Sequence, residues 1–141
     1  MTTKAATSPG KQKASNLFKE AESFCSFSVN DLRQAKEFYG QTLGLDVNET
    51  PEGLELQTGD NTVFLYPKPN HTPASFTVLN FHVNDIEEAV DELKSLGVKL
   101  EHYDMGDIKT DERGIARGPH GPVIAWFKDP AGNILSVLEE R

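Results

Sequence analysis

The chain has 141 residues, a formal net charge of −8, one cysteine and a hydrophobic content of 37%. This length and composition fit one globular domain, or two small modules that share a core. No apolar run approaches the roughly 20 residues that span a bilayer, and no signal-peptide pattern opens the chain. Because phosphate binding needs a basic patch, the acidic balance disfavours nucleic acid. We therefore expect a cytoplasmic protein with no membrane and no nucleic-acid partner.

Residues 1–21 are rich in Thr, Ala, Ser and Lys and are predicted to form a flexible leader. A short helix is possible over residues 14–21, using Leu17 and Phe18. The first 20 residues carry a net charge of +3, so the rest of the chain carries −11. The body is therefore strongly acidic and its leader mildly basic.

An internal repeat is the most informative feature of the body. Residues 27–35 (FSVNDLRQA) align with residues 81–89 (FHVNDIEEA) at an offset of 54, and both copies run on to a Leu-Gly pair ending at Gly44 or Gly97. Two copies are too few for a solenoid. The repeat therefore predicts a pseudo-symmetric pair of modules.

Each copy begins with a predicted strand, at residues 23–29 and 77–83, followed by a helix. Asn30 and Asn84 are candidate N-caps, because a short side-chain oxygen can accept from the N–H groups of the first turn. Gly44 and Gly97 stand where a helix ends in the left-handed conformation that glycine adopts at little cost.

Three short strands are predicted after each helix. In the first copy they span residues 45–49, 53–58 and 62–66, and in the second residues 98–102, 123–128 and 134–139. The chain is thus divided into a leader (1–21) and one domain (22–140), made of module one (22–67), a proline-rich linker (67–76) and module two (77–140). Module two has an extra loop at about residues 103–122, and a loop of that length is often functional.

Side chains alternate across a strand, so each first strand presents two different faces. The apolar face is expected to pack against the helix: Cys25, Phe27 and Val29 in the first copy, and Leu79, Phe81 and Val83 in the second. The other face is expected to line a cleft: Phe24, Ser26 and Ser28 in the first copy, and Val78, Asn80 and His82 in the second.

Trp126 and Ile124 are also predicted to face the cleft, because Phe127 packs on the helix. Such an aromatic, mostly apolar cavity is typical of a small-molecule pocket, although the same residues would also suit a filled core between two sheets. Arg117, on the long loop, could pair with an anionic ligand or form a surface ion pair. The histidines at 71, 102 and 120 lie in or near loops and are expected to be solvated.

Residues 29–44 (VNDLRQAKEFYGQTLG) and 127–133 (FKDPAGN) resemble the opening and closing motifs of the vicinal oxygen chelate superfamily. This superfamily includes glyoxalase I, bleomycin-resistance proteins and extradiol dioxygenases, and the resemblance covers residues 23–140. It implies an α+β fold in which two βαβββ modules form a curved mixed sheet around a cleft, with the helices on the outer face. It also implies a homodimer, with the modules pairing either within one chain or across the dimer.

Enzymes of this superfamily hold a divalent metal in the cleft through the first and last strands of the modules. At the matching positions this sequence has Phe24, Phe64, Val78 and Ser136. Phenylalanine and valine cannot coordinate a metal, and a neutral serine is a poor ligand. We therefore expect no metal and no cofactor, and interpret His82 as a polar pocket residue.

The sequence thus predicts a metal-independent, glyoxalase/bleomycin-resistance/dioxygenase-like protein that binds a small organic molecule. The expected ligand-binding residues are Phe24, Ser26, Phe64, Val78, Asn80, His82, Arg117, Trp126 and Ser136. The alternative is an enzyme, a lyase, isomerase or dioxygenase of the same superfamily, with a shifted or absent metal site. A third possibility is an interaction protein with a filled cleft. No catalytic residue is assigned.

Overall fold

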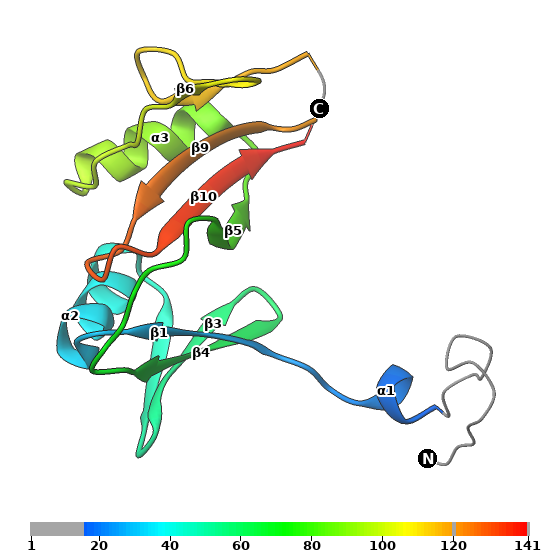
Figure 1. The fold of residues 1–141 in the computed structure, drawn as a ribbon, viewed down its shortest axis with the longest axis vertical. Coiled ribbons are helices and arrows are strands. Elements are labelled where there is room, and N and C mark those ends of the chain that lie inside the picture. The colour runs from blue at the N-terminus through cyan, green and yellow to red at the C-terminus, as the bar shows by residue number, and fades with distance from the viewer. Residues whose placement is uncertain (1–15, 120, 141) are drawn as a thin grey trace.

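Two four-stranded mixed sheets, one from each half of the chain, form the body of the protein (Figure 1). The computed structural model describes residues 16–119 and 121–140. The first sheet has the order β1-β4-β3-β2 and contains β1 (Cys25–Val29), β2 (Asp46–Thr50), β3 (Gly53–Thr58) and β4 (Asn61–Pro67). The second has the order β5-β10-β9-β8 and contains β5 (Thr77–His82), β8 (Ile115–Ala116), β9 (Val123–Lys128) and β10 (Ile134–Glu139).

The two sheets have the same topology. The first strand of each lies parallel to the last, β1 to β4 and β5 to β10, and the other pairs are antiparallel. A helical segment follows each first strand: α2 (Leu32–Lys36) with η2 (Glu37–Thr42) in the first half, and α3 (Ile86–Ser95) in the second. The predicted α+β fold with two βαβββ modules is confirmed.

The helices cover one face of the sheets and leave the other face uncovered by helix. Both α2 and α3 lie on the left of the view in Figure 1. The buried residues of α3, which are Ile86, Val90 and Leu93, join the apolar residues of β9 and β10 in the core. Strand alternation then places the opposite side chains of each sheet on the free face.

The helix boundaries were predicted correctly at their ends and wrongly at their starts. Asp31 and Asp85 are the N-caps, not Asn30 and Asn84: the Asp31 carboxylate accepts from the Gln34 N–H at 3.1 Å. Asp85 has the extended backbone of an N-cap and accepts from two N–H groups of α3. The first helix also changes from α to π winding at residue 37.

Both terminating glycines have the expected left-handed conformation. Gly44 has φ 77° and Gly97 has φ 83°. A side chain would be strained there, so these positions separate helix from strand in both modules.

The strand predicted at residues 98–102 is wrong. Only Leu100 pairs there, in an isolated bridge to Phe127. The edge of the second sheet is instead β8, which lies within the stretch predicted as a loop, because Ile115 and Ala116 bury their side chains against β9. The same stretch contains a small hairpin of β6 (Asp104–Met105) and β7 (Ile108–Lys109).

Two other predictions fail for positional reasons. Cys25 is exposed, although it shares a strand face with the buried Phe27 and Val29. The reason is that α2 covers the other end of β1, as Figure 1 shows. His71 is half-buried and not solvated: its Nδ1 lies 2.7 Å from Ser28 Oγ and its Nε2 lies 3.1 Å from the Ala131 carbonyl oxygen.

The turn at residues 129–133 joins the two halves through buried polar groups. Tyr39 donates its hydroxyl hydrogen to Asp129 Oδ2 at 2.7 Å. Asn133 Nδ2 donates to the same carboxylate at 3.0 Å and to the Ser28 carbonyl oxygen at 2.9 Å. Together with His71, these contacts fix the first module on the second. We call Tyr39, Asp129 and Asn133 the inter-module clasp.

The segment from residue 16 to the start of β1 extends away from the body, toward the right of Figure 1. Part of the short helix predicted there is present as α1 (Leu17–Glu20), whereas residues 1–15 of the predicted leader lie outside the described residues. None of the helices in the described part of the chain is long and apolar enough to cross a membrane.

Candidate functional site

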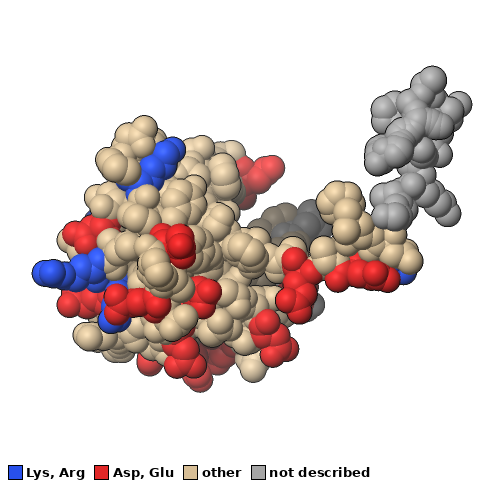
Figure 2. All heavy atoms as spheres, turned by 90° about the horizontal axis from the view of Figure 1, so that it is seen from below, with Lys and Arg blue, Asp and Glu red and all other residues tan. Residues whose placement is uncertain are grey.

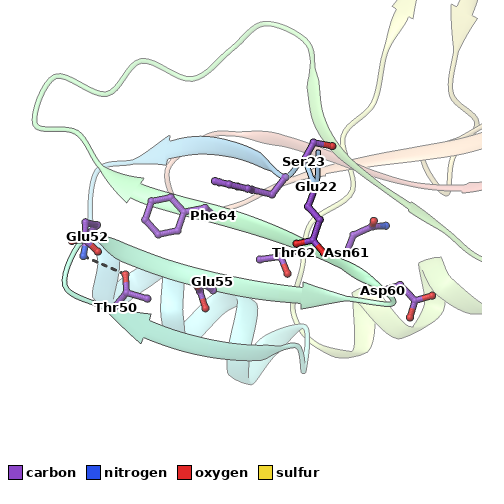
Figure 3. Close-up of a pocket in the computed structure, with 10 residues that line it drawn as sticks. Glu22, Ser23, Thr50, Glu52, Glu55, Asp60, Asn61, Thr62 and Phe64 are labelled. Carbon is purple, nitrogen blue, oxygen red and sulfur yellow. Dashed lines mark hydrogen bonds between the residues drawn. The ribbon is translucent and has the colours of Figure 1, made fainter. Parts of the chain in front are cut away.

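A cavity of about 700 Å³ lies on the free face of the first sheet (Figure 3). Its walls come from the segment before β1, from the hairpin turns at both ends of β3, and from β3 and β4 themselves. The lining residues are Glu22, Ser23, Phe24, Thr50, Glu52, Glu55, Asp60, Asn61, Thr62 and Phe64. A volume of this size suits a small organic molecule.

Two aromatic rings supply the apolar part of the cavity. Phe64 is half-buried in β4, and its neighbour in the register is Ser26 of β1. Phe24 precedes β1 and is 67% exposed, which is unusual for a phenylalanine. The sheet therefore brings two of the predicted ligand-binding residues, Phe24 and Phe64, into one cavity. It places another predicted residue, Ser26, beside Phe64.

Four carboxylates line the same cavity: Glu22, Glu52, Glu55 and Asp60. Glu52 and Asp60 stand in the two turns that bound β3, and Glu55 projects from β3 itself, as Figure 3 shows. The end of the molecule that carries β2, β3 and β4 is rich in Asp and Glu (Figure 2). Sequence reasoning identified both turns but did not connect them, since only the hairpin places their acidic residues along one cavity.

Three predicted residues of the second module, Asn80, Trp126 and Ser136, lie on the free face of the second sheet. Ser136 is buried and donates its hydroxyl hydrogen to Asn80 Oδ1 at 2.5 Å. Trp126 Nε1 donates to the Thr77 hydroxyl at 3.1 Å, and the Tyr103 ring packs edge-on to the Trp126 ring at 5.3 Å. Val78 is half-buried and packs against the hydrophobic core, at an irregularity in the pairing of β5 with β10.

His82 and Arg117 stand apart from these residues. His82 is exposed, and its Nε2 lies 3.3 Å from Glu140 Oε1. Arg117 donates to Glu87 Oε2 at 3.1 Å, at the start of α3 and thus on the helix side of the sheet. The surface ion pair is the contact that Arg117 makes.

The sequence and the fold are both similar to those of known proteins. The family model of the Glyoxalase/Bleomycin resistance protein/Dioxygenase superfamily matches residues 23–137. The chain belongs to this superfamily. No curated protein gives a significant match to it.

Solved structures of the glyoxalase superfamily share the fold. Lactoylglutathione lyase from Agrobacterium tumefaciens has 22% identity and a TM-score of 0.62, over 85% of this chain and 93% of that one. TnmS3, an antibiotic binding protein from Streptomyces sp. CB03234, has 25% identity and a TM-score of 0.60, over 86% and 98%. The fosfomycin resistance protein FosX from Listeria monocytogenes has 11% identity and a TM-score of 0.65, over 86% and 94%.

The residues at the superfamily's metal positions do not fit a metal ion. Phe24, Phe64 and Val78 have no lone pair to donate, and the Ser136 hydroxyl already bonds to Asn80. Within residues 16–119 and 121–140, no group of three or more His, Cys, Asp or Glu side chains is arranged to hold an ion. The arrangement supplies apolar surface and hydrogen-bonding groups at these positions.

Proposed function

We propose that this member of the glyoxalase superfamily binds a small organic molecule, without a metal, in the cavity on the free face of the first sheet. The observation that carries the proposal is the exposed Phe24 beside Phe64 in a 700 Å³ cavity, at positions where related enzymes need metal ligands. An aromatic ring that is 67% exposed gains about 25 cal/mol for each Å² that a ligand covers. The antibiotic binding protein TnmS3 has the same fold, and its name supports a binding role.

A second copy of the chain completes the binding site in this proposal. The cavity is open to solvent, and Tyr66 of β4 and Phe76 of the linker are further large aromatic side chains that are exposed. Covering such surface on dimerisation is favourable. The free face of the second sheet, with Trp126, Asn80 and Ser136, is the surface we propose to close the cavity of the other copy. Light scattering should then give the mass of a dimer, and a monomer would contradict this part of the proposal.

The binding function is tested by thermal shift with a library of small organic molecules, on protein dialysed against a chelator. A ligand at 100 times its dissociation constant should stabilise the fold by about 2.7 kcal/mol. For each compound that shifts the melting temperature, the Phe64→Ala variant should lower the affinity at least about tenfold, since it removes an aromatic wall.

Leu96→Ala is the matched control, because Leu96 is an exposed apolar residue on the helix side, at the end of α3. It should leave the affinity unchanged. The proposal fails if no compound shifts the melting temperature, or if Phe64→Ala and Leu96→Ala bind as tightly as the original protein. Metal independence would be refuted if the protein bound a divalent metal stoichiometrically and the compounds bound only when that metal was present.

A further inference from the structure

We infer that the cavity selects cationic aromatic molecules over neutral or anionic ones. This inference rests on the proposed function and adds the charge and shape of the ligand. It follows from the combination of two aromatic rings with an unneutralised acidic rim in one cavity.

The carboxylates come from different elements and surround the aromatic rings. Glu22 approaches from the segment before β1, and Glu52 and Asp60 stand at opposite ends of β3. Figure 3 shows Glu55 between them on β3, below Phe64. A ligand that contacts Phe64 is therefore within the field of carboxylates on several sides.

Among the described residues, no cationic side chain lines this cavity. The ion pairs found in the described residues lie elsewhere: Lys36 with Glu49, Arg113 and Arg117 with the acidic residues of α3, and Lys128 with Glu101. Glu55 has a neutral partner, the Asn48 amide, at 3.0 Å. Within residues 16–119 and 121–140, no ion pair therefore balances its negative charge or those of Glu52 and Asp60.

Both chemical features favour the same ligand. Carboxylates along a concave surface concentrate the negative potential and attract a cation, and the attraction is weakened by salt. The face of an aromatic ring also attracts a cation, while a planar ligand can stack on it. An anion of the same shape would meet repulsion from every wall, so a planar cation is the ligand that matches this site.

The test compares two probes of nearly the same size and shape, 10-methylacridinium and acridine, in mildly alkaline buffer where acridine is uncharged. Fluorescence titration should show at least about tenfold tighter binding of the methylacridinium cation at low salt. The variant Glu52→Gln/Glu55→Gln/Asp60→Asn should reduce this preference to less than about twofold, because it removes three charges while keeping the shape of the cavity. The readout is the ratio of the two affinities, so a change in affinity that is common to both probes does not affect the test.

The control variant is Glu88→Gln/Glu92→Gln/Asp104→Asn, which changes the net charge equally but at exposed positions on α3 and β6. It should keep the preference for the cation. Equal binding of the two probes, no measurable binding of either, or equal loss in both triple variants would overturn the inference. In each of these cases the proposed function still stands if neutral library compounds bind and lose affinity on Phe64→Ala, so the two failures are distinguishable.

Discussion

Replacing Tyr39 with phenylalanine tests the inter-module clasp. Tyr39 is fully buried, and its hydroxyl donates to Asp129 Oδ2 at 2.7 Å. A hydrogen bond to a charged group contributes about 1.5–3 kcal/mol. Since the Asp129 carboxylate keeps three other donors, the N–H groups of Ala131 and Asn133 and the Asn133 amide, we expect a loss of about 2 kcal/mol.

Urea denaturation measures this loss directly. The midpoint should fall while the dependence of the unfolding free energy on urea stays the same, because the folded surface does not change. The melting temperature should fall by about 6–8 °C for a domain of this size. Tyr66→Phe is the control: Tyr66 is an exposed residue of β4 and should change the stability by less than about 0.5 kcal/mol.

The pH dependence gives a second readout of the same contact. Burial, the charge of Asp129 and the hydrogen bond to it all raise the pKa of Tyr39 well above its ordinary value of 10.0. Above pH about 10 the unfolded chain ionises Tyr39 while the folded protein keeps the proton, so the unfolding free energy falls as the pH rises. Tyr39 contributes up to about 1.4 kcal/mol per pH unit to this fall.

The Tyr39→Phe variant lacks this contribution, so its stability should approach that of the original protein as the pH rises above about 10. Tyr103, whose pKa is also raised, by burial and by Glu101, is present in both proteins and cancels in the comparison. Two results would refute the reasoning: a loss below about 0.5 kcal/mol at neutral pH, or a stability difference that stays constant through pH about 11.

Three further substitutions test the fold around the site. Gly53→Ala should cost more than about 2 kcal/mol by urea denaturation, because the new Cβ would lie 2.0 Å from the Leu65 carbonyl oxygen. A cost below about 1 kcal/mol would contradict this clash. His71→Ala should cost about 1–2 kcal/mol by the same measurement, since it removes two hydrogen bonds between the linker and the modules, and an unchanged midpoint would argue against them. Arg113→Ala should accelerate amide hydrogen exchange over residues 103–119, because it releases this stretch from α3, and unaltered exchange would refute that anchoring role.

Much of the fold was predictable from the sequence because its determinants are local. The repeat at an offset of 54 defined two modules, and the left-handed glycines Gly44 and Gly97 ended their helices. Strand alternation assigned Phe24 and Ser26 to the free face of one sheet and Asn80 to that of the other, and the resemblance to the superfamily added Phe64 and Ser136. Period-2 patterns determine which face a residue occupies, whatever the sheet packs against.

The predictions failed where position along an element matters more than pattern. Cys25 has the right alternation for burial, but it lies beyond the part of β1 that the helix covers. The strand expected at residues 98–102 has suitable residues, but β8 occupies the edge of the sheet in its place. His71 lies in a loop and was expected to be solvated. The fold places this loop between β1 and the 129–133 turn, where His71 contacts Ser28 and Ala131.

The sequence by itself determined the family, the modules and the absence of ligand donors at the metal positions, because each of these depends on residue identity at a fixed spacing. Only the tertiary structure decided what surrounds Phe24 and Phe64. Glu22, Glu52, Glu55 and Asp60 are spread over 39 residues of chain, and the pairing of β4 with both β1 and β3 brings them to one cavity. Tertiary structure likewise decided the place of Arg117 in the second module, where it contacts Glu87 of α3 on the helix side of the sheet.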